Sequence, residues 1–250
     1  MKLAYADRAE YLGDPAFVSV PLAGLTSKKY ADTLAQQIRP DSARSAQTIK
    51  PGQPLPFESD QTTHYSVVDQ AGNMVAVTYT LNTNFGTGIV AAGTGILLNN
   101  EMDDFSAKPG VPNAYGLVGG AANAVAAGKR PLSSMTPTLV LKDQQPWLVT
   151  GSPGGARIIT TVLQQIVNGI DFGMNPAEAA AAVRFHHQWM PDELRVEKGF
   201  SPDTLHLLRQ KGQNVVVKPA MGRTQTIQVQ GQALWGYSDP RNPDGLTLGY

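Results

Sequence analysis

The chain has 250 residues, of which 42% are hydrophobic and 16% charged, so it is long enough to bury a substantial core. Twenty basic and twenty acidic residues cancel, and this balance gives no general attraction to nucleic acid or to an anionic membrane. The absence of cysteine excludes disulfides, thiolate metal ligands and a cysteine nucleophile. No apolar run reaches the roughly 18 to 20 residues that span a bilayer, and the first residues lack the apolar core of a signal peptide. We therefore expect a soluble protein without nucleic-acid or membrane partners.

The N-terminal part of the chain predicts two helices followed by a linker. Helical spacing covers residues 3–12 and 27–38, and Ser27 or Thr26 can cap the second helix. Residues 49–61, IKPGQPLPFESDQ, hold three prolines and no periodicity, which is typical of an extended and exposed segment. We expect one domain with an extra N-terminal piece, and a boundary at this linker.

The rest of the chain predicts two hairpins and several helices. The first hairpin joins TTHYSVVD to MVAVTYTLN, and its apolar face is formed by Val75, Val77, Tyr79 and Leu81. Residues 86–131 are rich in loops, with a short strand near residues 95–100 and a possible lid over 108–120. Further elements are a hairpin over 136–152, helices over 156–170, 176–185 and 201–212, and strands over 214–218, 224–230 and 233–239. This order indicates an α+β fold with antiparallel sheets.

A polar, acidic loop runs directly into the first predicted strand in the stretch FESDQTTHYSVVD. A threonine hydroxyl is a poor nucleophile without a base, but an N-terminal threonine can use its own α-amine, whose ordinary pKa is about 7.7 to 8.0. Thr62 gains such an amine only if the chain is cut between Gln61 and Thr62. On spacing alone a structural threonine at the start of a strand is the commoner interpretation, so both stay open here.

The turn of this hairpin gives a geometric prediction. A two-residue turn at Ala71 and Gly72 would place Thr62 opposite Leu81, which leaves Thr80 on the other face of the sheet. A three-residue turn with Gly72 in the left-handed region places Thr62 opposite Thr80 instead. Geometry alone leaves both turns open; the resemblance to a known family that is described next implies that Thr80 lies beside Thr62, and on that ground we predict the odd-length turn.

Several segments resemble, in order, the γ-glutamyltranspeptidases, which belong to the N-terminal-nucleophile hydrolases. The segments are ADRAEYLGDP, DQTTHYSVVD, VAVTYTLN, FGTGIV, LLNNEMDDFS, PNAYGLVGG, KRPLSSMTPT, TGSPGGARI and RFHHQWMPDELRVEKG. They cover nearly the whole chain. The resemblance implies a four-layer αββα sandwich with antiparallel sheets, here without most of the large subunit.

The resemblance also implies an activity and a set of site residues. The γ-glutamyl group of glutathione or a related compound would pass to water or to an amino acid or dipeptide acceptor, without cofactor or metal. After self-cleavage at Gln61–Thr62, Thr62 would form the acyl-enzyme and Thr80 would assist. The implied substrate-binding residues are Asn82, Glu101 and Asp104 for the α-amine, Ser133 and Ser134 for the α-carboxylate, and Tyr115 as a lid.

Gly154 and Gly155 lie where a predicted strand meets a helix, so their backbone N–H groups can point at a developing oxyanion. They resemble the family's oxyanion hole, although local sequence alone favours a simple strand-to-helix turn. The segment GSPGGAR lacks the Lys-Ser/Thr of a phosphate-binding loop. Neighbouring His186 and His187 cannot form one metal site by themselves, and we expect one packed and one exposed histidine.

The resemblance divides the chain into residues 1–61, the end of the large subunit with its linker, and residues 62–250, the small catalytic subunit. The remaining large-subunit segment, including an arginine for the α-carboxylate, is not matched by this sequence, so either the chain is a fragment or truncated form, or a partner chain supplies the remainder. Without it the chain should expose apolar surface. A periplasmic or secreted location follows from the resemblance alone.

Two other functions stay open. Relatives with the same fold cleave glutaryl cephalosporins, whose acyl group has no α-amine, and the presence of Asp104 favours a γ-glutamyl substrate instead. A noncatalytic truncated subunit is compatible with every motif if the missing segment is not supplied.

Overall fold

The computed structural model describes residues 1–49, 62–106, 108 and 110–249. The chain forms two compact units whose segments alternate along the sequence. The first unit comprises the described parts of Met1–Glu58, Glu101–Ser133 and Phe185–Lys218, and the second those of Ser59–Asn100, Ser134–Arg184 and Pro219–Tyr250. The first residues thus pack with two later segments of the first unit, while the division of the chain at residues 61 and 62 stays a prediction. Most of the predicted linker, including Gln61, lies outside the described residues.

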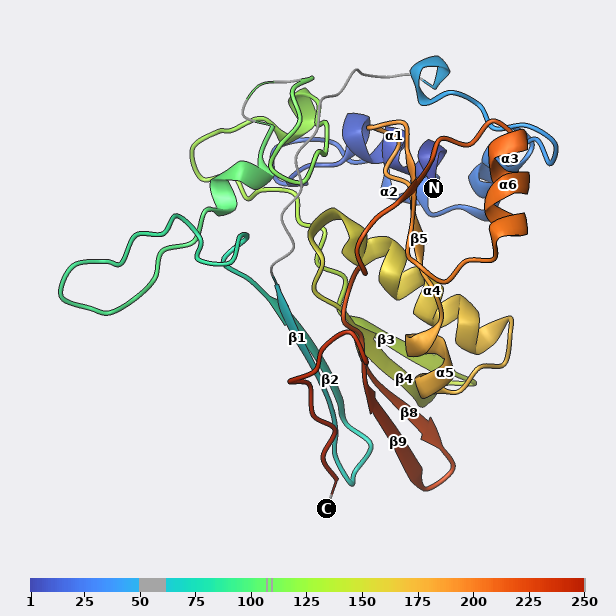
Figure 1. Ribbon diagram of the computed structural model, residues 1–250. Coiled ribbons are helices and arrows are strands. Elements are labelled where there is room, and N and C mark those ends of the chain that lie inside the picture. The colour runs from blue at the N-terminus through green and yellow to red at the C-terminus, as the bar shows by residue number, and fades with distance from the viewer. Residues whose placement is uncertain (50–61, 107, 109, 250) are drawn as a thin grey trace. The chain divides into compact units, whose positions relative to one another are not determined.

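The second unit is built in layers (Figure 1). Strands β1 (Thr63–Val68) and β2 (Met74–Tyr79) form an antiparallel hairpin. Strands β3 (Thr138–Lys142), β4 (Gln145–Gly151), β8 (Gln225–Gln230) and β9 (Ala233–Ser238) form an antiparallel sheet in the order β3-β4-β8-β9. The hairpin packs on β4 and β8, while helix α4 (Ile158–Ile170) packs on β4 and helix α5 (Pro176–Ala181) on β8 and β9. Helices, sheet and hairpin correspond to three layers of the predicted αββα arrangement.

The register of the β1–β2 hairpin confirms the odd-length turn. Thr63 pairs with Tyr79, and Val68 pairs with Met74. The amide of Asp69 donates to the carbonyl of Asn73 at 3.1 Å, which leaves residues 70–72 as the loop. Gly72 has φ +83°, a left-handed conformation that glycine adopts without a steric penalty. Extending this register by one residue places Thr62 opposite Thr80.

The hairpin buries its polar face rather than its apolar one. Tyr65, Val67 and Val75 are each about half exposed and Tyr79 is 60% exposed, whereas His64 is only 6% exposed. The polar face is satisfied by hydrogen bonds, because Ser66 donates to Gln225 in the second sheet and His64 is hydrogen-bonded to Thr78 and Ser66 within the hairpin. Apolar side chains are thus exposed on the outward face of the hairpin.

Helix α4 also departs from the pattern expected from its sequence. Helical spacing predicts one apolar face formed by Ile158, Ile159, Val162, Leu163, Ile166 and Val167. Of these, Leu163 is 47% exposed. Thr161 and Gln165 are buried instead. The inner surface of this helix is therefore more polar than its apolar spacing suggested.

The first unit contains helices and a small mixed sheet. Its helices are α1 (Lys2–Tyr11), α2 (Leu22–Leu25), α3 (Lys28–Ala35) and α6 (Pro202–Gln210), and its strands are β5 (Phe185–His186), β6 (Leu194–Val196) and β7 (Val215–Val217). Strands β6 and β7 run parallel, whereas the other paired strands among the described residues are antiparallel, as the predicted α+β fold requires. Helix α6 connects β6 and β7, as a parallel pair requires a crossover. The short strand predicted near residues 95–100 is reduced to a bridge between Val90 and Leu97.

Four single-turn 3₁₀ helices complete the described elements: η1 (Ala46–Thr48), η2 (Glu101–Asp104) and η3 (Ala121–Asn123) in the first unit, and η4 (Gly155–Arg157) in the second. None of the helices in the described part of the chain is both long and apolar enough to cross a membrane.

Side chains from later segments hold the N-terminal segment of the first unit. Buried Asp14 accepts hydrogen bonds from the Nη2, Nε and backbone N–H groups of Arg130, at 2.7 to 3.1 Å from the donor nitrogens. The indole Nε1 of Trp189 donates to the carbonyl oxygens of Ala46 and Ile49 at 3.1 and 2.9 Å. These contacts do not depend on the peptide bonds between residues 49 and 62.

Candidate active site

Two threonine hydroxyls meet at the open end of the β1–β2 hairpin. The hydroxyl of Thr62 donates to the Oγ1 atom of Thr80 over 3.3 Å. The same Oγ1 atom accepts the backbone N–H of Asn82 at 2.8 Å. Both hydroxyls therefore lie on one face of the hairpin, as the predicted register requires.

Asn82 follows β2 in a strained but well-supported conformation. Its φ is +73°, in the left-handed region that asparagine tolerates better than most residues. It is 2% exposed, and its Nδ2 group donates to the carbonyl of Asn100 at 3.2 Å. This conformation directs the Asn82 amide N–H at Thr80, so the turn supports the threonine pair.

Gly154 and Gly155 form a buried turn between β4 and α4. Gly154 has φ +140° and Gly155 has φ +54°, and both values favour glycine. Gly154 also packs closely on the backbone of Gly222, where a Cβ atom would lie 3.5 Å from the Cα atom. Among the hydrogen bonds of the described residues, none uses the N–H of either glycine as a donor. The turn can therefore present two N–H groups at the start of a helix, where they suit a negative charge.

Two acidic side chains meet in η2 of the first unit. The carboxyl groups of Glu101 and Asp104 are hydrogen-bonded to one another. Burial, followed by the hydrogen bond and the charge of Glu101, raises the pKa of Asp104 well above its usual range. The positive charge of Arg8 acts in the opposite direction on this pKa. Burial also raises the pKa of Glu101, so the pair retains a shared proton at neutral pH.

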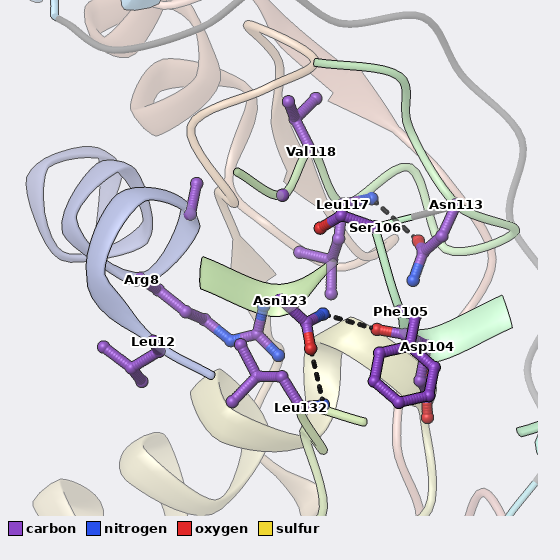
Figure 2. A pocket seen from close by; sticks show the side chains of 12 residues that line it. Arg8, Leu12, Asp104, Phe105, Ser106, Asn113, Leu117, Val118, Asn123 and Leu132 are labelled. Carbon is purple, nitrogen blue, oxygen red and sulfur yellow. Dashed lines mark hydrogen bonds between the residues drawn. The ribbon is translucent and has the colours of Figure 1, made fainter. Parts of the chain in front are cut away.

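The backbone of Asp104 is held by Asn123, which the sequence analysis did not identify. Figure 2 shows the Nδ2 group of Asn123 donating to the carbonyl of Asp104 at 2.7 Å and its Oδ1 atom accepting the N–H of Leu132 at 3.0 Å. Asp104 and Asn123 line a small cavity, together with Arg8 from α1. The volume of this cavity, about 10 Å³, is too small for a substrate. Asn123 thus connects Asp104 to the residue that precedes Ser133.

Tyr115 is buried rather than packed loosely on the surface. It is 3% exposed, and its carbonyl oxygen accepts the Nε2 group of Gln188 at 3.0 Å. Burial raises the pKa of the Tyr115 hydroxyl, and the nearby charges of Asp104 and Glu101 add to this effect. The hydroxyl therefore lies close to the acidic pair of η2.

The boundary between the two units falls between the two consecutive serines. Ser133 ends the segment that belongs to the first unit, and Ser134 begins the next segment of the second. The carbonyl of Ser134 accepts the hydroxyl of Thr136 at 2.9 Å. The second unit thus brings together Thr62, Thr80 and Asn82, and the first unit brings together Glu101, Asp104 and Tyr115.

A family model described as gamma-glutamyltranspeptidase matches residues 1–248. The chain belongs to the γ-glutamyltranspeptidase family. It is 68% identical to the glutathione hydrolase proenzyme of Escherichia coli K12 and 50% identical to that of Pseudomonas sp. A14, and both matches cover the whole chain. They cover only 43% and 45% of these relatives, so the chain spans less than half the length of the proenzymes that it matches.

Solved structures support the membership in this transpeptidase family. A mutant γ-glutamyltranspeptidase of Helicobacter pylori is 58% identical with a TM-score of 0.71, over 72% of this chain and 99% of that one. A cephalosporin acylase of Bacillus halodurans is 29% identical with a TM-score of 0.78, over 96% of this chain and 42% of that one. The fold is therefore shared with an acylase, whereas sequence identity is higher to the transpeptidase.

The adjacent histidines of this family member correct one further expectation. His186 and His187 are 2% and 4% exposed, so neither is at the surface. His187 accepts the backbone N–H of Trp189 on its Nδ1 atom at 3.1 Å, which gives it a packing role. Across the residues that the structure describes, no group of three or more histidine, aspartate or glutamate side chains could hold a metal ion.

Proposed function

We propose that Thr62 is the N-terminal nucleophile of a γ-glutamyltransferase and glutathione hydrolase, formed by self-cleavage of the Gln61–Thr62 bond. The hydrogen bond between the Thr62 and Thr80 hydroxyls carries this proposal. It is the contact that the predicted register requires, and it orients the Thr62 hydroxyl on a rigid strand. The names of the relatives, glutathione hydrolase proenzymes, support both the reaction and a precursor that is cut.

Self-cleavage would begin with attack of the Thr62 oxygen on the carbonyl carbon of Gln61. The C–N bond breaks, its nitrogen gains a proton as the α-amine of Thr62, and an ester links the two residues. Water then hydrolyses the ester, which leaves a carboxylate on Gln61 and restores the Thr62 hydroxyl. Thr80 supports this step by holding the attacking hydroxyl in place.

The mature enzyme would use the freed amine as its general base. The Thr62 hydroxyl transfers its proton to this amine as its oxygen attacks the γ-carbonyl carbon of the substrate. The N–H groups of Gly154 and Gly155 stabilise the oxyanion. The C–N bond of the substrate then breaks, the leaving amine takes the proton, and the γ-glutamyl group remains on Thr62 as an ester. Water or the amine of an amino acid or dipeptide acceptor attacks this ester and releases the product.

Recognition of the γ-glutamyl group would rest on charge. Glu101 and Asp104, with Asn82, bind the α-ammonium group, because a buried carboxylate pairs strongly with such a cation. Ser133 and Ser134 donate to the α-carboxylate, and Tyr115 covers the bound group. The remaining large-subunit segment acts as a partner, and the family resemblance favours a periplasmic or secreted enzyme.

The similarity to a cephalosporin acylase keeps a second substrate class open. A glutaryl group has the same acyl chain as γ-glutamate but no α-amine. Such a substrate would leave the acidic pair of Glu101 and Asp104 without a cation. The burial and raised pKa of Asp104 therefore favour the γ-glutamyl substrate.

The experiment is mass spectrometry of the purified protein together with turnover of a γ-glutamyl anilide. We expect fragments of residues 1–61 and 62–250 in the wild-type protein, and an intact chain for Thr62→Ala, with turnover lower by at least about 10⁴-fold. Thr63→Ala is the matched control, because Thr63 is an exposed neighbour on the other face of β1. A Thr62→Ala protein that is cleaved and active would refute the proposal, and turnover of a glutaryl anilide alone would assign the acylase function.

A further inference from the structure

His64 occupies the centre of a hydrogen-bond chain two residues beyond Thr62. Its Nδ1 atom lies 2.7 Å from the Thr78 hydroxyl, and its Nε2 atom lies 3.1 Å from the Ser66 hydroxyl. The Ser66 hydroxyl donates to the carbonyl of Gln225 in β8 at 2.9 Å. The chain therefore crosses from β2 through β1 to the second sheet.

The direction of each bond follows from the last one and from the neutral state of the ring. Ser66 donates its single hydroxyl hydrogen to the carbonyl of Gln225, so in its contact with His64 it must accept a hydrogen from the Nε2 atom. Because burial lowers the pKa of the ring to about 4, the ring is neutral near pH 7, so its Nδ1 atom carries a lone pair and accepts the hydroxyl hydrogen of Thr78. His64 is thus a neutral Nε2–H tautomer with both nitrogens satisfied.

The ring also rests on the last residue of β4. A Cβ atom at Gly151 would lie 2.2 Å from the Cε1 atom of His64 and 2.5 Å from its Nδ1 atom, closer than any real contact. The imidazole therefore occupies the place that a side chain at position 151 would take. This contact brings β1 and β4 together at the point where β4 ends.

The two residues in this contact, His64 and Gly151, each lie close in sequence to residues of the proposed active site. His64 follows Thr62 by two residues and lies on the same face of β1, since side chains alternate along a strand. Gly151 precedes Gly154 by three residues, and the intervening Ser152 is fully buried and accepts the backbone N–H of Arg223 at 2.8 Å. The stretch from Gly151 to the Gly154–Gly155 turn is therefore held in place.

We propose that His64 is a positioning residue that, through its contact with Gly151, sets the Thr62 hydroxyl relative to the N–H groups of Gly154 and Gly155. This role rests on the proposed function, because it concerns the nucleophile and the oxyanion hole of that reaction. It predicts that a change at the contact alters the chemical step. Substrate affinity should change little, because Glu101 and Asp104 belong to the other unit, and Asn82, the third proposed amine-binding residue, keeps its own hydrogen bonds to Thr80 and Asn100.

The test compares Gly151→Ala and His64→Asn with the wild-type protein in steady-state turnover of a γ-glutamyl anilide. Gly151→Ala retains every hydrogen-bonding group and displaces only the ring. We expect its kcat to fall on the order of 10²-fold, as misplacement of reacting groups by about 1 Å does, with KM within about two-fold. His64→Asn retains an acceptor for Thr78, and we expect a smaller loss of about ten-fold. The exposed His206 of α6 supplies the matched control His206→Asn, which should leave both constants unchanged.

Two further measurements keep the test decisive. Nitrogen NMR of the histidine rings should show a neutral Nε2–H tautomer for His64, independently of any activity. If Gly151→Ala does not fold, Ser66→Ala removes only the far end of the chain and should lower kcat by several-fold without changing KM. Equal kcat in wild type and folded variants, or an Nδ1–H tautomer, would overturn the inference while leaving the proposed function intact. A wild-type protein that neither cuts itself nor turns over the anilide would overturn the proposed function first.

Discussion

The β1–β2 hairpin and the η2 turn prepare their functional groups in opposite ways. On the hairpin, Thr62, Thr80 and His64 are neutral, and hydrogen bonds along rigid strands fix their positions. In η2, Glu101 and Asp104 are acidic groups whose burial perturbs their protonation. The comparison teaches that the proposed chemical step depends on geometry, whereas the proposed recognition step depends on charge. Changes in the two regions should therefore have different signatures.

The largest expected effect is on the β1–β2 hairpin, where His64 should make the unfolding free energy depend on pH. The pKa of His64 falls from 6.5 to about 4 on folding, so between these values the unfolded chain binds a proton that the folded protein does not. The unfolding free energy should therefore rise with pH between about pH 4 and pH 6.5. Near pH 4 the neutral, buried His64 should lower the unfolding free energy by about 3 kcal/mol relative to pH 7. Urea unfolding at pH 7 and pH 5 measures the effect. His64→Asn, which cannot titrate, should lose less stability on acidification than the wild type, and an equal loss in both proteins would contradict the assignment.

A somewhat smaller effect is expected in η2, on the KM for a γ-glutamyl substrate. Asp104→Asn retains the shape of the side chain but removes the charge that would pair with an α-ammonium group. A charge-assisted hydrogen bond contributes about 1.5 to 3 kcal/mol, so KM for a γ-glutamyl substrate should rise about 10- to 100-fold, with a smaller change in kcat. The matched control is Asp103→Asn, because Asp103 lies in the same turn and its Oδ2 atom accepts the N–H of Ala114. If Asp104→Asn and Asp103→Asn raise KM equally, Asp104 has no specific role in recognising the α-ammonium group.

The smallest effect is the pH dependence of substrate affinity. The raised pKa of the Glu101–Asp104 pair means that a proton must leave when an ammonium group binds, so affinity should increase with pH while the substrate amine stays charged. One proton limits this change to about ten-fold per pH unit. Glu101→Gln removes the contribution of Glu101 to the raised pKa of Asp104, while the effect of burial remains, so it should weaken the dependence of KM on pH. A slope that this substitution leaves unchanged would locate the titrating group elsewhere.

The hairpin was predictable from sequence to the level of its register. Gly72 allows the three-residue turn, and the role that the family resemblance implies for Thr80 selected it, since only this turn places Thr80 opposite Thr62. The direction in which the hairpin faces was less accessible. Alternation separates Val75 and Tyr79 from the threonines, but it does not reveal which face finds partners on another sheet.

Supporting residues were missed because their signals are nonlocal. Asn123 stands in a loop with no periodic pattern, and its bonds to Asp104 and Leu132 join positions 19 and 9 residues away. His64 had a local signal, since it lies two residues from Thr62 in a predicted strand and therefore on the same face. Its partner Gly151 could not be inferred, because the contact joins two different sheets.

The parallel pair of β6 and β7 shows the same limit. Each strand has three residues, which is too short for a clear alternation. Helix α6 was predicted correctly, yet it fits a connection to either an antiparallel or a parallel neighbour. Only the three-dimensional path of the chain distinguishes the two.

The grip of Arg130 on Asp14 and of Trp189 on Ala46 and Ile49 bears on how a cut chain would behave in the laboratory. Breaking one bond beside Thr62 would leave these attachments whole, so the shorter product should comigrate with the longer one on a native gel and separate from it only in denaturant. Purification without denaturant would then yield a nicked assembly that resembles an uncut protein in size.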